Sequence, residues 1–138
     1  LTHENGTPIV KLYGSKYPEC QGGNLLMNFF DQDGKIYPYE KIGQMAGKQK
    51  ISICSGYFCN PGIDETNHRI SAEELTHYFR SRTDGDYQSM TRFSGKTRGA
   101  IRVSVGLATV KKDLDKFMSF VTDLKDSKLV DWTLAAVK

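Results

Sequence analysis

The sequence has no long apolar run and no recognisable targeting segment. Its apolar stretches fall well short of the ~18 residues that can span a membrane, and its first residues lack the charged, apolar and small-residue order of a signal peptide. These absences predict a protein that does not enter a membrane. Leu1, in place of an initiator methionine, predicts a fragment or a processed product of a longer protein.

Cysteine is also scarce. The three cysteines, Cys20, Cys54 and Cys59, are an odd number and show no C-x-x-C spacing. This argues against a disulfide framework and against a structural zinc site, and it favours a reducing, cytoplasmic compartment. His68 and His77 add no spacing typical of metal ligands, so we predict no metal.

No block of charge of one sign occurs. The formal net charge is only +3, and lysine and arginine alternate with acidic residues along the chain. This pattern predicts no nucleic-acid partner. The phosphate-binding P-loop, the dinucleotide glycine fingerprint and the serine nucleophile elbow are all missing, which excludes the enzyme classes that they mark.

What is present is an ordinary globular composition over 138 residues, enough for a single domain at 1–138 with its own core. Short apolar or alternating runs predict four strands: Ile9–Tyr13, Leu25–Phe30, Ile51–Cys54 and Ala100–Val105. Helices are predicted at Pro38–Gly47, after a Ser71 cap and after a Thr109 cap. The order predicts an α+β fold, a small and mostly antiparallel sheet with helices packed on one face.

Three of these elements carry more specific predictions. Leu25–Phe30 is apolar nearly throughout, which predicts a place at the centre of the sheet. Ser71 and Glu74 have the spacing of a capping box. Helical spacing predicts an apolar face of Leu75, Tyr78 and Phe79 on the second helix. On the last helix it predicts a core stripe of Val110, Leu114, Phe117, Met118, Val121 and Leu124.

The stretch Cys54–Gly62 draws most attention. It follows an apolar run that predicts a buried strand, and Gly56 would end that strand. Asn60, Pro61 and Gly62 predict a turn. Cys59 would therefore lie on a tight loop just beyond a strand end, where reactive side chains are often found. The alternative is a small thiol that only packs in the core.

Arg102 is the second candidate. Ile101, Val103 and Val105 would share one face of its strand, so Arg102 and Ser104 would share the other. A guanidinium on that face could bind a carboxylate through its planar fork, or it could simply be solvated. Lys96 and Arg98 could join it in an anion site, but their spacing is not specific.

Four segments in order resemble the molybdenum cofactor sulfurases and cysteine desulfurases, which are class V aminotransferase-type enzymes that depend on pyridoxal phosphate. The segments are Asn5–Tyr13, Asn28–Gly34, Cys54–Gly62, and Gly99–Gly106 with the helix that follows. The resemblance covers roughly Leu1 to Leu124. It departs from the family at Cys54 and Ser55, where arginine and threonine often stand, and at Tyr57, where sulfurases often have a second cysteine.

The resemblance implies that this chain is the small C-terminal domain of a fold-type-I pyridoxal-phosphate enzyme. Cys59 would match the catalytic cysteine that takes sulfur from the substrate, and Arg102 the arginine that binds the carboxylate of a cysteine-like amino acid. The cofactor lysine would belong to a large partner domain, so the chain alone would bind no pyridoxal phosphate and would be inactive.

Two other functions remain open from the sequence. One is a non-catalytic, stand-alone interaction module, and the other is the small domain of an aminotransferase or lyase without desulfurase activity. The sulfur acceptor and whether the intact protein is a homodimer are open as well.

Overall fold

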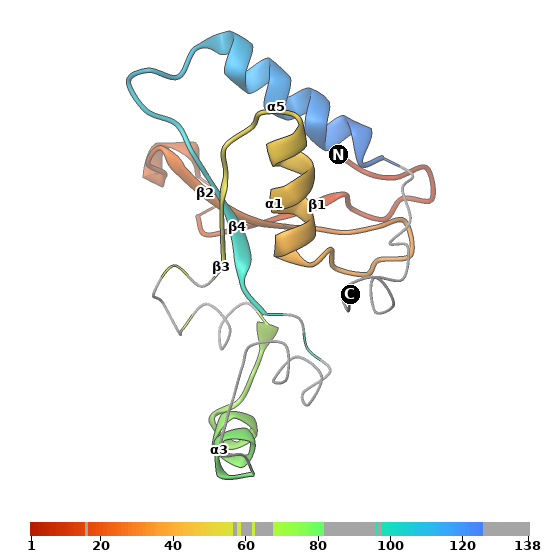
Figure 1. The fold of residues 1–138 in the computed structure, drawn as a ribbon, viewed down its shortest axis with the longest axis vertical. Helices are drawn as coiled ribbons and strands as arrows, with labels where there is room; N and C mark the ends of the chain where they lie inside the picture. Colours follow the sequence, from red (N-terminus) through yellow and green to blue (C-terminus); the bar gives the residue numbers. More distant parts are fainter. Residues whose placement is uncertain are drawn as a thin grey trace.

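A computed structural model describes residues 1–15, 17–56, 58, 62, 68–81, 96 and 98–125. Within these residues the chain forms an α+β domain (Figure 1), as predicted. Its elements are β1 (Val10–Tyr13), the 3₁₀ helix η1 (Pro18–Cys20), β2 (Asn24–Phe29), α1 (Tyr39–Lys48), β3 (Cys54–Gly56), α3 (Ala72–Arg80), β4 (Ala100–Ser104) and α5 (Lys111–Asp123). Among the helices described, none has the length and apolar character needed to cross a membrane.

The four strands form one sheet in the order β1-β2-β4-β3, and every neighbouring pair is antiparallel. The prediction that the apolar strand Leu25–Phe30 lies at the centre is confirmed, because β2 pairs with both β1 and β4. β3 is an edge strand beside β4. The chain that leaves β3 therefore starts next to the first residues of β4, since Gly56 is the register partner of Ala100.

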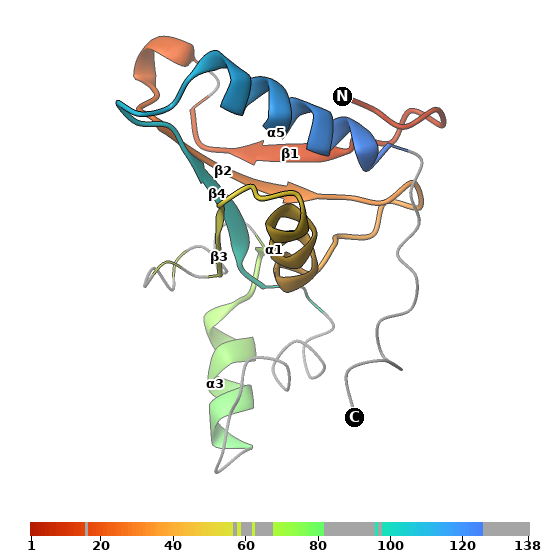
Figure 2. The ribbon, with the colours of Figure 1, turned by 45° about the horizontal axis from the view of Figure 1, so that its top comes forward.

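Helices α1 and α5 cover the same face of this sheet (Figures 1 and 2). One buried cluster joins α1 and α5 to the strands, with the ring centroids of Phe29 and Phe120 6.4 Å apart in an edge-to-face arrangement. Its fully buried members are Ile9, Met27, Phe29, Tyr37, Ile42, Ala46, Ile101, Phe120, Val121 and Leu124. The predicted layer arrangement is confirmed, and the opposite face of the sheet carries neither α1 nor α5.

The predicted strand Ile51–Cys54 was placed too early, because β3 starts at Cys54 and ends at Gly56. Ile51 instead donates its backbone N–H to the Ala46 carbonyl at the end of α1, at 2.9 Å. Ile51 and Ile53 nevertheless pack against the core. Ile51 and Ile53 are apolar because they pack against the core, not because they pair in a strand. A short apolar run in a sequence does not distinguish these two cases.

The helix predicted here is confirmed as α5, but its predicted N-cap was wrong and its predicted core face was right only in part. Val110, not Thr109, occupies the N-cap position, and the Asp113 carboxylate accepts the Val110 N–H at 3.0 Å. Thr109 instead accepts the backbone N–H of Gly106 through its hydroxyl oxygen.

The buried face of α5 overlaps the predicted stripe, which is confirmed for Phe117, Val121 and Leu124. Phe120, which the stripe omitted, is buried, whereas Leu114 and Met118 are 45% and 49% exposed. The members that contact the core are Phe117, Phe120, Val121 and Leu124, spaced at i, i+3, i+4 and i+7. Val110 is exposed too, so α5 enters the core through its C-terminal half.

The α3 helix begins with the predicted capping box. The Ser71 hydroxyl oxygen accepts the Glu74 N–H, and the Glu74 carboxylate accepts the Ser71 N–H at 2.8 Å. Lys96 also pairs with Glu74 at 2.7 Å. Ile70, Leu75 and Tyr78 form a small apolar cluster, but Phe79, predicted to share that face, is 64% exposed.

We expect the Glu74 part of this cap to depend on pH. Hydrogen bonds from Lys96 and then from the Ser71 backbone lower the pKa of Glu74 below its usual 4.5. A lowered folded-state pKa stabilises α3 above the unfolded-state pKa, and this contribution is lost as the pH falls through the folded-state value. Glu74→Gln should therefore reduce hydrogen-exchange protection of the α3 amides at pH 7, and the difference from wild type should disappear as the pH falls through the lowered folded-state pKa of Glu74.

Ser71→Ala is the matched control for this experiment. It removes a hydroxyl acceptor that does not titrate, at a cost of about 1 kcal/mol of helix stability. Its effect should persist at acid pH. If the Glu74→Gln difference also persisted there, the ion pair would not be the cause.

Candidate functional site

The face of the sheet opposite α1 and α5 carries a row of side chains that crosses all four strands. The register pairs Tyr13 with Leu26, Leu26 with Arg102, and Arg102 with Cys54. Register partners in antiparallel strands point to the same side. Because Ile101 lies in the core on the α5 side, Arg102 faces away from the helices, as its strand alternation predicted.

Arg102 is half-buried, and its guanidinium group lies over an aromatic ring. The guanidinium carbon lies 5.0 Å from the centroid of the Phe58 ring, which is within cation–π range. Among the residues that the structure describes, no carboxylate pairs with Arg102. Its Nε atom is buried and has no hydrogen-bond partner there. A buried donor left in this state favours a ligand that supplies an acceptor.

A second polar group lies on the same face, beside the Arg102 row. The His68 Nε2 atom donates to the Gly99 carbonyl oxygen at 2.8 Å, and Asn28 donates from Nδ2 to the Tyr13 hydroxyl at 3.2 Å. The same Asn28 atom lies 3.4 Å from the Gly99 oxygen. Burial raises the pKa of Tyr13 above its usual 10.0, and the Asn28 hydrogen bond partly offsets this rise.

The residues of this group, Tyr13, Asn28, His68 and Gly99, come from four separate parts of the chain and lie together at the start of β4. Position 99 requires glycine for two reasons. Its φ is +71°, which residues with a β-carbon rarely adopt, and an added Cβ would lie 2.9 Å from the Tyr39 ring. Sequence reasoning missed Tyr13 and Asn28 and considered His68 only as a metal ligand. The one available signal was Asn28, an amide inside an otherwise apolar strand.

The exposure of Cys54 differs from the prediction. Cys54 was expected at the end of a buried strand, but it starts β3 and is exposed on the same face as Arg102. Cys20 is also exposed, and neither forms a disulfide. Cys59 lies outside the described residues, so its predicted role remains a prediction.

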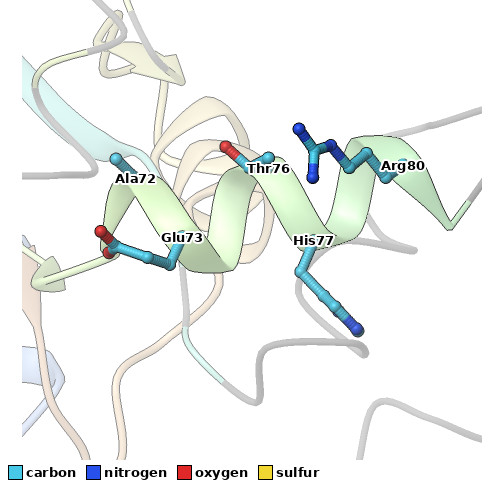
Figure 3. Close-up of a pocket in the computed structure, with 5 residues that line it drawn as sticks. All are labelled: Ala72, Glu73, Thr76, His77 and Arg80. Atoms are coloured by element: carbon cyan, nitrogen blue, oxygen red, sulfur yellow. The ribbon is translucent and has the colours of Figure 1, made fainter.

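The described residues form no metal site. They contain no group of three or more histidine, cysteine, aspartate or glutamate residues that could hold a metal ion. Among the described residues, the pocket in Figure 3 is lined only by side chains of α3. Its lining residues are Ala72, Glu73, Thr76, His77 and Arg80. His77 is exposed there.

Together these observations describe a small α+β domain with α1 and α5 on one face of its sheet. The other face presents an arginine whose buried Nε donor has no acceptor among the described residues. In sequence the chain is similar to proteins named molybdenum cofactor sulfurase. It is 30% identical to the human protein over 136 residues, 32% identical to molybdenum cofactor sulfurase 3 of Aedes aegypti over 125, and 30% identical to the Drosophila mojavensis protein over 135.

These alignments cover 88–96% of the chain but only 15–17% of each relative. The chain is therefore homologous to one segment of the molybdenum cofactor sulfurases. No protein-family model matches it, and no solved structure does.

Proposed function

We propose that this chain is the small C-terminal domain of a pyridoxal-phosphate-dependent enzyme of the molybdenum cofactor sulfurase or cysteine desulfurase type. In this role it contributes a carboxylate-binding arginine, Arg102, and a sulfur-accepting cysteine, Cys59. The observation that supports the proposal most directly is the position of Arg102 on the sheet face opposite α1 and α5, with a buried Nε that has no partner among the described residues. Homology to a segment of named sulfurases supports the reaction class.

Arg102 would hold the substrate by its carboxylate. A guanidinium donates two parallel N–H bonds to the two oxygens of a carboxylate, which fixes both position and orientation. Such fixation keeps the reacting atoms of an amino acid within reach of a nucleophile. No aspartate or glutamate occurs on the four strands, so no acidic side chain of the sheet competes for Arg102.

Cys59 would receive the sulfur. A thiolate is the reactive form of cysteine, and nearby positive charge favours it. In the overall exchange, L-cysteine and the Cys59 thiol become alanine and a Cys59 persulfide, so that all atoms are conserved. The sequence places Cys59 one residue after Phe58, whose ring contacts Arg102.

The described residues do not by themselves fit pyridoxal phosphate. Lys11 is the only lysine on the described strands and is exposed, with its Nζ over the Tyr13 ring at 5.1 Å. No carboxylate accompanies it on those strands to meet a pyridine nitrogen. The cofactor, its lysine and most of its contacts would therefore come from a large partner domain of the parent protein.

The test is Arg102→Ala in the full-length protein that contains this chain. We expect kcat/KM for L-cysteine to fall by about 10- to 150-fold, chiefly through KM. This corresponds to the roughly 1.5–3 kcal/mol of a charge-assisted hydrogen bond. Arg102→Lys should recover little of the loss because an ammonium lacks the planar fork. Unchanged kcat/KM in Arg102→Ala would refute the carboxylate role and leave a non-catalytic interaction module as the better interpretation.

A further inference from the structure

The chain on both sides of Cys59 is attached to the same place on the sheet, the start of β4. Before Cys59, Gly56 is the register partner of Ala100, and the Gly56 carbonyl oxygen would lie 3.2 Å from a β-carbon added at Gly99. After Cys59, the His68 Nε2 atom donates to the Gly99 carbonyl oxygen at 2.8 Å. The chain before Cys59 and the chain after it therefore contact two adjacent residues.

The sheet supports the His68 contact. The His68 ring meets the Tyr13 ring edge-on, with the centroids 6.5 Å apart. Asn28 is buried, donates to the Tyr13 hydroxyl at 3.2 Å and lies 3.4 Å from the Gly99 oxygen. A hydrogen bond that is partly shielded from water is electrostatically stronger than an exposed one. His68 is therefore held by β1 and β2 as well as by the start of β4.

A second attachment follows one residue later. Arg69 has a φ of +53°, in the left-handed region, and such conformations persist where surrounding contacts hold them. The Arg69 carbonyl oxygen accepts a hydrogen bond from the Lys96 Nζ atom at 2.8 Å, and the same ammonium pairs with Glu74 at 2.7 Å. Figures 1 and 2 show the chain that leads into α3 next to the first residues of β4. Two separate contacts thus bind this part of the chain.

We infer that His68 and Lys96 are positioning residues for Cys59, and that they act by binding the chain after Cys59 to the residues that lead into β4. This inference rests on the proposed sulfur-accepting role of Cys59. A nucleophile reacts fastest when its position relative to the substrate is restricted, and small displacements lower the rate strongly. A chain attached on both sides of the nucleophile has fewer conformations than a chain attached on one side.

The first experiment compares sulfur transfer with alkylation of Cys59 in the full-length protein. His68→Phe keeps a ring next to Tyr13 but removes the N–H donor. It should lower kcat for L-cysteine by about 3- to 10-fold, the effect of one neutral hydrogen bond, and leave KM within about twofold. Alkylation of Cys59 by iodoacetamide, followed by mass spectrometry, should slow by no more than about twofold, because a reagent in solution requires a thiolate but no single position of it.

His68→Gln is the matched rescue. Its side-chain amide offers an N–H donor at a similar distance from the backbone, so kcat should return to within about twofold of wild type. If His68→Phe slowed sulfur transfer and alkylation by the same factor, His68 would act on the reactivity of the thiol, and the inference would be wrong. It would also be wrong if His68→Phe left kcat unchanged. If Cys59→Ala retained sulfur transfer, the proposed function would fail instead.

A second measurement does not depend on turnover. A protease specific for glutamate would be applied to the same full-length protein, and mass spectrometry would compare cleavage after Glu65, which lies between Cys59 and His68 in the sequence, with cleavage after Glu19 in η1. His68→Phe and Lys96→Met should each raise the Glu65 to Glu19 ratio by about 3- to 10-fold, because cleavage follows the population of the opened chain. A ratio that stayed unchanged in both variants would overturn the inference.

Discussion

Cys59→Ala in the full-length protein is expected to abolish transfer of sulfur from L-cysteine. The thiolate is the group that attacks sulfur, and alanine has no nucleophile at this position. Loss of a covalent nucleophile lowers the rate by a factor on the order of 10³ or more, because the remaining interactions only bind and orient the substrate. The measurement is sulfide or persulfide formed per enzyme, with mass spectrometry to locate the added sulfur atom.

Cys54→Ser and Cys20→Ser are the matched controls. Both thiols are exposed. Cys54 lies next to Arg102 in the register, so Cys54→Ser is the more stringent control of the two. Each should retain sulfur transfer within about threefold, since surface changes away from a reacting group have small effects. A Cys54→Ser enzyme as inactive as Cys59→Ala, with the extra sulfur on Cys54 in the wild type, would move the acceptor role to Cys54.

Phe120→Ala is expected to have the largest effect on stability. Phe120 is 1% exposed, and its ring meets Phe29 and Phe117 in the main core. Removing a buried phenyl group loses its transfer free energy and leaves a cavity, which together cost about 3–5 kcal/mol. Because a domain of this size is stable by only about 5–15 kcal/mol, the variant should be near the limit of folding at 37 °C.

Met118→Ala provides the control on the same helix. Met118 lies two residues earlier in α5 and is 49% exposed, so its truncation should change the free energy of unfolding by no more than about 0.5 kcal/mol. Urea unfolding of the two variants and the wild type measures both effects. A larger loss for Met118 than for Phe120 would mean that α5 presents the face that periodicity first suggested.

The local features of this protein could be read from short stretches of sequence. The four strands, helices α1 and α3 and the Ser71 cap were placed within a few residues, because each depends on residues close together in the chain. The direction of Arg102 followed from alternation within β4 alone. The position of β2 at the centre followed from its nearly continuous apolar run.

Features that depend on distant contacts could not be read in this way. Helical periodicity allowed two neighbouring stripes on α5, and only the sheet beneath it selected the one that includes Phe120. Likewise Ile51 and Ile53 are apolar because they pack on the core, while strand pairing began only at Cys54. The alternatives differ little in local energy, so the choice was made by burial against another element.

The sequence by itself determined the fold class, the order of the elements and the side of β4 on which Arg102 lies, because propensity and periodicity act between near neighbours. The tertiary structure alone decided what surrounds Arg102 and which polar groups share its face. Tyr13, Asn28, His68 and Gly99 meet only because β1, β2 and β4 pair in that order. Phe58 reaches Arg102 only because β3 pairs with β4 at the edge of the sheet, and no local pattern encodes that pairing.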